Sequence, residues 1–285
     1  MAASFLSACG RQSYTVGTDV RLDEITSVYA GGSGMTIDSQ WSYGIYKDED
    51  KYSMTRVWWD EKKNKMREET AQIDRYEYEE ILYSLEGYKY KKYKADTKVM
   101  DGETESVRIV WPRDPNGSYR MDFGEDGMYR VVNAMSLVWG NYGYAFEDPI
   151  EIEQIQEFSI GYGPEDIYEG RQVFEARLED GKVIALYKPM GKRMEDAYTK
   201  EADPSLLSEI KRLMEETGAN RWDGFQGHSM ALDGSSFSMT VTGSDGKSIS
   251  AYGHMSYPDG FRNFWEQIEG LFTAAFGGEL PGGDF

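Results

Sequence analysis

The sequence predicts an α+β protein made of two tandem pseudo-repeats, each an antiparallel sheet with helices packed on one face. Alternating apolar and polar residues on both sides of short acidic or glycine turns indicate half-buried antiparallel strands. Apolar residues at steps of three and four indicate helices that come after groups of strands. Single strands do not alternate with single helices, which disfavours a doubly wound parallel sheet. We expect about three strands, a helix, three strands and a second helix in each unit.

An internal duplication supports the two units. In each half, a helix-like segment is followed by three turn landmarks in the same order. The landmarks are Asp101-Gly102, Asn116-Gly117 and Asp126-Gly127 in the first half, and Asp233-Gly234, Asp245-Gly246 and Asp259-Gly260 in the second. Each dipeptide alone is common in turns, but the shared order favours a repeat. We expect repeat units at 25–142 and 155–276, a junction at 143–154 and a flexible acidic tail at 277–285.

The first unit is expected to open with a hairpin around the acidic turn Asp48-Glu49-Asp50. Its elements are strands at 41–46 and 52–58, a helix at 76–87, a strand rich in Lys and Tyr, a strand through Val107 and Ile109, and a helix that opens at Asp126. Upstream, Gly31-Gly32-Ser33-Gly34 lacks the Lys-Ser or Lys-Thr ending of a phosphate-binding loop, so we interpret it as a strand end or bulge.

The second unit is expected to follow the same plan, with a hairpin around Asp180-Gly181. Its elements are a strand near 155–164, hairpin strands at 172–178 and 183–187, a helix at 204–218, a strand through Phe237, Met239 and Val241, and a last helix. In that helix Phe261, Phe264, Trp265 and Ile268 recur at helical spacing, which predicts a wide apolar face that belongs to the core.

The composition is that of an acidic chain with one cysteine. Its 285 residues include 50 Asp plus Glu against 31 Lys plus Arg, for a net charge of −19. This charge repels phosphate backbones, so we expect no nucleic-acid partner. With one cysteine the chain cannot form an intramolecular disulfide, and no apolar run reaches the roughly 18 residues of a spanning helix. Nothing in the sequence indicates a cofactor.

The single cysteine lies in the segment Leu6-Ser7-Ala8-Cys9, which resembles a bacterial lipobox. The resemblance implies that Cys9 carries a diacylglyceryl group and that 1–23 is a signal-peptide remnant, a lipobox and a polar tether. Met1 to Phe5 lacks the basic residue and most of the apolar region of a signal peptide, so we expect the native leader to extend further upstream. The domain is then extracytoplasmic and held at the outer face of the cell membrane by lipid.

The last third of the chain resembles a broad group of uncharacterised lipoproteins of Gram-positive bacteria. Three motifs carry this resemblance: Asp233-Gly234-Ser235-Ser236-Phe237, Asp245-Gly246-Lys247 and Tyr257-Pro258-Asp259. It implies the same location outside the membrane, and it implies no reaction, because no activity is established for the group.

Two motifs suggest catalysis, but their context disfavours it. Gly227-His228-Ser229-Met230-Ala231 is similar to a serine-esterase nucleophile elbow, which needs a helix after the serine, whereas another strand is expected here. His228 and His254 lie on neighbouring expected strands, but two histidines without a third ligand do not define a zinc site. We therefore predict neither a catalytic residue nor a metal ligand.

The acidic segments also have a plainer interpretation than metal binding. Asp48-Glu49-Asp50 and Asp114-Pro115-Asn116-Gly117 place oxygens together, as calcium requires, but they lack the ligand spacing and the distant glutamate of an EF-hand loop. Solvated turns explain them better.

Aromatic residues mark a candidate binding surface. Tyr88, Tyr90 and Tyr93 alternate with lysines in the one basic stretch of the chain, and Trp222 adds a further large ring. Such residues stack on sugars and attract anionic polymers. An amphipathic strand with tyrosines inward and lysines along an exposed edge is the alternative, and we favour it for the tyrosine stretch.

These observations favour a non-catalytic binding or interaction module on the cell surface, with an envelope polysaccharide or a protein as partner. The alternative is a cell-surface hydrolase of glycans whose carboxylates converge only in the fold, at about 5 to 10 Å from each other. A deep pocket with two close carboxylates would favour the hydrolase, and a shallow aromatic or apolar patch would favour the binding module.

Overall fold

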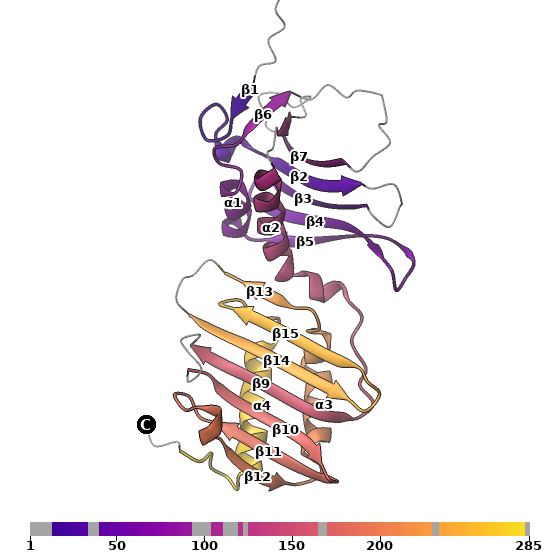
Figure 1. Ribbon diagram of the computed structural model, residues 1–285, viewed down its shortest axis with the longest axis vertical. Coiled ribbons are helices and arrows are strands. Elements are labelled where there is room, and N and C mark those ends of the chain that lie inside the picture. The colour runs from indigo at the N-terminus through magenta and orange to yellow at the C-terminus, as the bar shows by residue number, and fades with distance from the viewer. Residues whose placement is uncertain are drawn as a thin grey trace, which may run out of the picture. The chain divides into compact units, whose positions relative to one another are not determined.

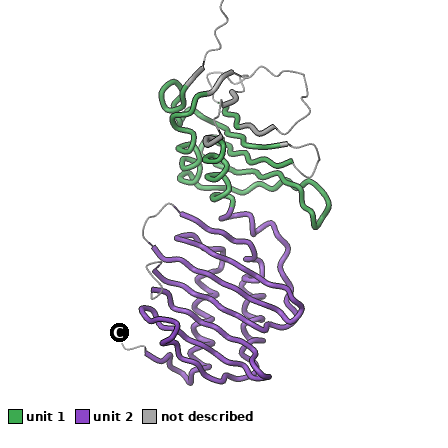
Figure 2. Tube along the Cα trace, viewed as in Figure 1, with its two compact units in different colours: residues 1–139 green, residues 140–285 purple. Residues whose placement is uncertain are grey.

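The computed structural model describes residues 13–33, 40–92, 104–110, 119–121, 125–164, 170–229 and 234–282. The chain divides into two compact units, residues 1–139 and residues 140–285 (Figure 2). The described residues form fifteen strands and four α-helices (Figure 1). None of these helices has both the length and the hydropathy that would let it cross a membrane.

The predicted α+β class is wrong, because the described chain is mainly β. Each unit is built on one extended sheet, of eight strands in the first and seven in the second, and not on balanced layers of strands and helices. The predicted pattern of three strands before each first helix is wrong as well. Four strands that are consecutive in the chain and adjacent in the sheet precede each of the helices α1 (Arg75–Tyr83) and α3 (Leu206–Thr217).

The sheet of the first unit has the strand order β1-β6-β8-β7-β2-β3-β4-β5. Its strands are β1 (Ser13–Thr15), β2 (Ser27–Ser33), β3 (Trp41–Asp48), β4 (Lys51–Asp60), β5 (Lys65–Ile73), β6 (Lys89–Lys92), β7 (Thr104–Val110) and β8 (Tyr119–Met121). Neighbouring strands pair antiparallel. Strand β5 was not predicted, because its Glu, Lys, Gln and Ala residues favour a helix in isolation. Pairing with β4 buries its Arg67, Ala71 and Ile73, and this tertiary contact overrides the local preference.

Helix α1 begins at a capping box. The side chain of Asp74 accepts a hydrogen bond from the backbone N–H of Glu77 at 2.8 Å, and the Glu77 carboxylate accepts one from the N–H of Asp74 at 2.9 Å. One turn later Tyr78 is buried against Tyr52 of β4, with ring centroids 5.0 Å apart, and its hydroxyl donates to the carbonyl of Ile25 at 2.9 Å. These contacts fix α1 to one face of the sheet, and α2 (Glu125–Gly140) follows β8.

The sheet of the second unit has the strand order β12-β11-β10-β9-β14-β15-β13. Its strands are β9 (Ile155–Pro164), β10 (Gln172–Glu179), β11 (Lys182–Lys188), β12 (Tyr198–Ala202), β13 (Gln226–His228), β14 (Ser235–Gly243) and β15 (Ser248–His254). All neighbours pair antiparallel except β13 and β15, which run parallel. Strand β12 was not predicted either, because it is an edge strand whose residues are almost all exposed and so show no apolar alternation.

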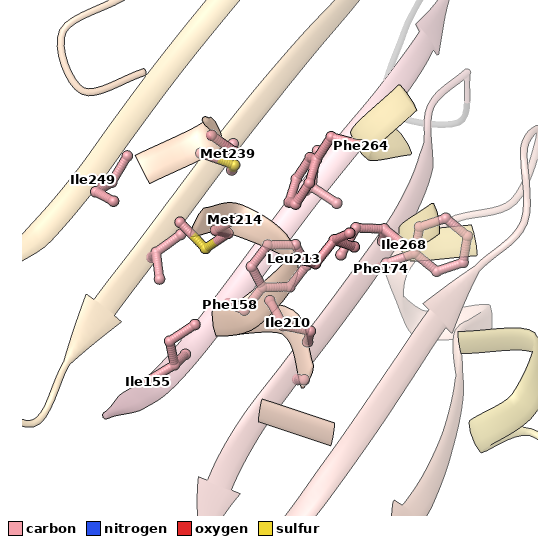
Figure 3. Close-up of a cluster of buried hydrophobic side chains, with 14 of the residues drawn as sticks. Ile155, Phe158, Phe174, Ile210, Leu213, Met214, Met239, Ile249, Phe264 and Ile268 are labelled. Atoms are coloured by element: carbon pink, nitrogen blue, oxygen red, sulfur yellow. The ribbon is translucent and has the colours of Figure 1, made fainter. Parts of the chain in front are cut away.

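Helices α3 and α4 (Phe261–Ala275) lie side by side on one face of this sheet (Figure 1). Between them and the strands is an aromatic and aliphatic core, in which Phe158 and Phe174 of the sheet lie beside Phe264 and Ile268 of α4 and Leu213 of α3 (Figure 3). The predicted apolar face of the last helix is confirmed, since its large residues are buried. Short 3-10 helices join the remaining segments: η1 (Leu22–Glu24), η3 (Gly143–Phe146), η4 (Met194–Asp196) and η5 (Ala219–Arg221).

The two sheets correspond in strand order. In sheet order, the run β5-β4-β3-β2-β7-β8-β6 of the first sheet corresponds to β12-β11-β10-β9-β14-β15-β13 of the second. The seven strands of each run also follow one another in the same order along the chain, from β2 to β8 and from β9 to β15. They differ in that β6 is antiparallel to β8, whereas β13 is parallel to β15, and in that β1 extends the first sheet by one strand. That the two units arose by duplication stays a prediction.

Candidate functional site

Six residues on β3, β4 and β5 form what we call the arginine–tryptophan cluster. They stand in two rows across the three strands, one of Trp41, Trp58 and Arg67 and the next of Tyr43, Arg56 and Glu69. Directly opposite residues of antiparallel strands project from the same face of a sheet, as do residues two apart along a strand. The register therefore gathers all six side chains on one face.

This face is a continuation of the core of the first unit. The next row, Ile45, Met54 and Ala71, is buried and apolar. Beyond it, large aromatic and charged residues replace the small apolar ones, and Trp41, Arg56 and Trp58 remain half-buried. The core thus passes into a surface on which the indole rings of Trp41 and Trp58 and the guanidinium of Arg56 are partly exposed to solvent.

Both arginines of the cluster lie over the ring of Trp58. The Cζ atom of Arg67 is 4.8 Å from the centroid of that ring, and the Cζ atom of Arg56 is 4.9 Å from it. Arg56 is also 5.4 Å from the centroid of the Tyr43 ring. A guanidinium at these distances is attracted by the negative face of an aromatic ring. The two cations therefore restrict the orientation of Trp58.

Arg67 is neutralised by two carboxylates. It is 6% exposed and donates to Asp60, which is 8% exposed, at 3.2 Å and to Glu69 at 3.1 Å. Burial of Asp60 opposes its ionisation, but hydrogen bonds from the N–H of Lys63 and from Arg67 outweigh this and hold the pKa of Asp60 below its ordinary value. The Asp60 side chain therefore stays a carboxylate at neutral pH.

Trp139 supports the cluster from α2. Its ring is 4% exposed and meets the ring of Trp58 edge to face, with centroids 6.3 Å apart. Trp41 is likewise in contact with Tyr43, at 6.2 Å between centroids. Each half-buried ring of the cluster thus rests on a second aromatic ring.

The two histidines named by the sequence come together in the second unit. His228 of β13 and His254 of β15 are register partners, with ring centroids 6.0 Å apart. Asn141 holds this corner, because its Oδ1 accepts from the N–H of His228 and from the hydroxyl of Ser256, each at 2.9 Å. Within the described ranges, no group of three or more His, Cys, Asp or Glu is arranged to hold a metal ion.

The nucleophile-elbow motif has the wrong surroundings for a serine esterase. Ser229 comes directly after β13, and its N–H donates to the carbonyl of His254 at 3.1 Å. The next described element is strand β14, where an elbow requires a helix. Met230 and Ala231 lie outside the described residues.

The structure describes the side chains of two of the four residues predicted for the binding surface, Trp222 and Tyr88. Trp222 is 1% exposed and lies in the core of the second unit against Phe264, with centroids 5.2 Å apart. Tyr88 is half-buried, and its backbone links the end of the α1 segment to Val16 through a hydrogen bond of 3.0 Å. The backbone of Tyr90 belongs to β6, and Tyr93 lies outside the described residues.

Of the other predicted features, one forms a turn, one belongs to a strand and the rest lie outside the described residues. Asp48-Glu49-Asp50 forms the tight turn of the β3–β4 hairpin, in which Glu49 has a φ of 53°. Gly31, Gly32 and Ser33 belong to β2, as the strand-end interpretation expected. Cys9, Gly34 and the segment 114–117 lie outside the described residues.

A hollow in the second unit gives no sign of an acid pair. It is shallow, opens to solvent and is lined by four isoleucines, Met214, Asn220, Lys211 and Glu215. Glu215, its one carboxylate, forms an ion pair with Lys211 one helical turn away. The hollow is apolar and does not resemble the carboxylate pocket of a glycoside hydrolase.

Sequence reasoning missed the arginine–tryptophan cluster. The available signal was the spacing of Trp41 and Tyr43, of Arg56 and Trp58, and of Arg67 and Glu69, each pair two residues apart on consecutive strands. No protein-family model matches the chain, and no curated protein has a sequence that matches it.

Proposed function

We propose that this chain is a lipid-anchored extracytoplasmic binding module that holds an envelope polysaccharide on the arginine–tryptophan cluster, without a catalytic role. The anchor is Cys9, as the lipobox resemblance implies. The observation that carries the binding role is the pair of half-buried rings, Trp41 and Trp58, placed opposite each other on two hydrogen-bonded strands.

Sugar rings suit such a surface. Their faces are apolar and pack on indole rings, while their hydroxyl groups need charged or polar partners at the ring edge. Arg56 and Glu69 lie in the row beside the two tryptophans and offer donors and acceptors for those hydroxyls. The strands hold these groups at fixed spacing, which a loop would not do.

The carboxylates of Glu69 in the cluster and of Asp60 beside it favour binding over hydrolysis. A glycosidase needs one carboxyl group that is protonated near neutral pH and a second that is ionised. Asp60 has a lowered pKa, and both Asp60 and Glu69 are bound to Arg67. The pair therefore neutralises a cation and is unsuited to proton transfer.

The test of binding is retention of the protein on insoluble wall polysaccharide purified from a Gram-positive bacterium. We expect Trp41→Ala to weaken binding about tenfold or more, as removal of an aromatic hot spot does. Trp59→Ala is the matched control, because Trp59 is also half-buried but is the next residue after Trp58 on β4 and so projects from the opposite face. Equal retention of the wild type and Trp41→Ala, or no retention of the wild type, would overturn the proposal.

The test of the anchor is metabolic labelling with a fatty-acid analogue in cells that express the full chain. The wild type should be labelled and Cys9→Ala should not, because the thiol is the acceptor that the lipobox resemblance assigns. Equal labelling of both proteins would contradict the anchor and leave the binding role to be judged by the polysaccharide assay.

A further inference from the structure

We propose that Arg56 is an anion-recognition residue and that the polysaccharide on the arginine–tryptophan cluster is acidic, with carboxylate or phosphate groups that Arg56 binds. This inference rests on the proposed binding function and adds the chemical class of the ligand. It follows from the place of Arg56 over two aromatic rings, with no carboxylate of the described residues paired to it.

Seven arginines of the described residues form an ion pair with an Asp or Glu side chain. The ion-paired arginines are Arg21, Arg67, Arg75, Arg177, Arg193, Arg212 and Arg262. Arg56 lies between the rings of Tyr43 and Trp58, and no carboxylate of the described residues is within ion-pair distance of it. Glu69, its register neighbour on β5, is bound by Arg67. The charge of Arg56 is therefore available to a ligand.

The surroundings of Arg56 suit recognition of an oxyanion. A guanidinium is planar and always charged, and its parallel N–H groups match the two oxygens of a carboxylate or phosphate. The two aromatic rings restrict the side chain, and half-burial lowers the local dielectric, which strengthens a charged hydrogen bond. An acidic group next to a sugar ring can then meet Arg56 while the ring packs on Trp41 or Trp58.

The charge of the whole chain makes this recognition local. With a net charge of −19 the protein repels a polyanion at long range, and the charge of Arg67 is cancelled by Asp60 and Glu69. Added salt screens the long-range repulsion more than it screens a half-buried contact. Binding should therefore hold or strengthen as salt rises from low to physiological concentration, whereas a basic patch would lose affinity.

The experiment compares three forms of the same wall polysaccharide: untreated, with its carboxylates methyl-esterified, and with its phosphodiesters removed by hydrofluoric acid. Affinity is measured from the fraction of protein that sediments with increasing amounts of the insoluble polysaccharide. We expect one of the two treatments to weaken binding of the wild type at least about tenfold, and the sensitive treatment identifies the anion. Arg56→Gln should bind all three forms with the same weakened affinity.

Two variants serve as controls. Arg56→Lys keeps the charge but loses the planar fork, so its preference for the anionic form should be intermediate. Arg108→Gln removes the same charge from the opposite face of the same sheet, because Arg108 lies between the buried residues Val107 and Ile109 on β7. It should bind like the wild type.

The outcomes separate this inference from the proposed function. If the wild type binds the untreated and both treated forms equally, the anion role is wrong and the binding module stands. If the wild type binds none of them, the proposed function is wrong. If Arg56→Gln and Arg108→Gln lose the same affinity, net charge explains the effect and Arg56 has no specific role. If Arg56→Gln fails to fold, the binding of the wild type and of Arg56→Lys to the three polysaccharide forms still tests whether Arg56 recognises the anion.

Discussion

Trp58 and Arg67 face each other across β4 and β5, with the guanidinium carbon 4.8 Å from the centre of the indole ring. The same guanidinium binds Asp60 and Glu69. One cation thus links an aromatic ring to two carboxylates, and the position of the ring depends on an ion pair that is largely buried.

Replacement of Asp60 by Asn should lower the stability of the first unit at neutral pH. Removal of the Asp60 charge leaves the buried guanidinium of Arg67 only partly compensated, by Glu69. Because the pKa of Asp60 in the fold lies below its ordinary value of 3.8, the unfolded chain binds more protons, and the stabilisation is lost as the pH falls from about 4 through the folded pKa. Thermal unfolding followed by tryptophan fluorescence across acidic pH should show a flatter dependence for Asp60→Asn. The control is Glu68→Gln, an exposed acid on β5; the same flattening in it would contradict the assignment.

Two glycines of the second unit should respond oppositely to alanine. A Cβ at Gly253 would lie 2.1 Å from the backbone oxygen of Ser256 and 2.7 Å from the ring of Phe237, so Gly253→Ala should destabilise the unit by about 1 to 3 kcal/mol. A Cβ at Gly270 of α4 meets no atom within 4 Å, so Gly270→Ala should stabilise it by about 0.5 to 1 kcal/mol. Urea unfolding measures both, and a shift of the two variants in the same direction would refute the packing of this region.

Phe264→Ala should be among the most damaging single changes in α4. The side chain is fully buried, with its ring 5.2 Å from Trp222 and 6.3 Å from Phe158 between centroids. Loss of its packing and the cavity left behind cost about 3 to 5 kcal/mol. Phe276→Ala, at the half-buried end of the same helix, should cost clearly less by the same urea titration. Similar losses for the two would argue against this core.

Alkaline pH should destabilise the first unit through Tyr46. Burial, followed by the neighbouring Tyr29 with its ring 5.3 Å away, raises the pKa of Tyr46 to about 12 from 10.0. The fold favours the neutral phenol, so this stabilisation is complete below pH 10 and is lost as the pH rises through 12. Ultraviolet absorbance of phenolate should show one late-titrating tyrosine fewer in Tyr46→Phe. Tyr76→Phe, which removes the hydroxyl of a tyrosine that is 81% exposed, is the control for the loss of one phenol.

Local patterns predicted the hairpins well and the edge strands poorly. The Asp180-Gly181 hairpin is present because both residues adopt the left-handed backbone that its tight turn requires, with φ of 49° and 80°. Strand β5 was missed because its residues prefer a helix, and β12 because its exposed residues show no alternation. These two omissions, together with the weight given to helices, led to the wrong fold class.

The cluster was hidden for a different reason. The spacing of two within each strand is visible in the sequence, but the strand register decides that Trp41, Trp58 and Arg67 share a row. A slip of one residue would place Trp59 on that face instead of Trp58. Trp222 shows the converse, since its chemistry suggested a surface role and its place beside α4 puts it in the core.

The two cations over Trp58 also set the thermodynamics of any contact made there. A free indole loses rotamer entropy when a ligand immobilises it, at roughly 0.5 to 1.5 kcal/mol for each side chain that must be ordered. For Trp58 that loss has already occurred during folding, through Arg56, Arg67 and Trp139. A ligand that binds this ring therefore loses its own conformational entropy, while the protein loses little more.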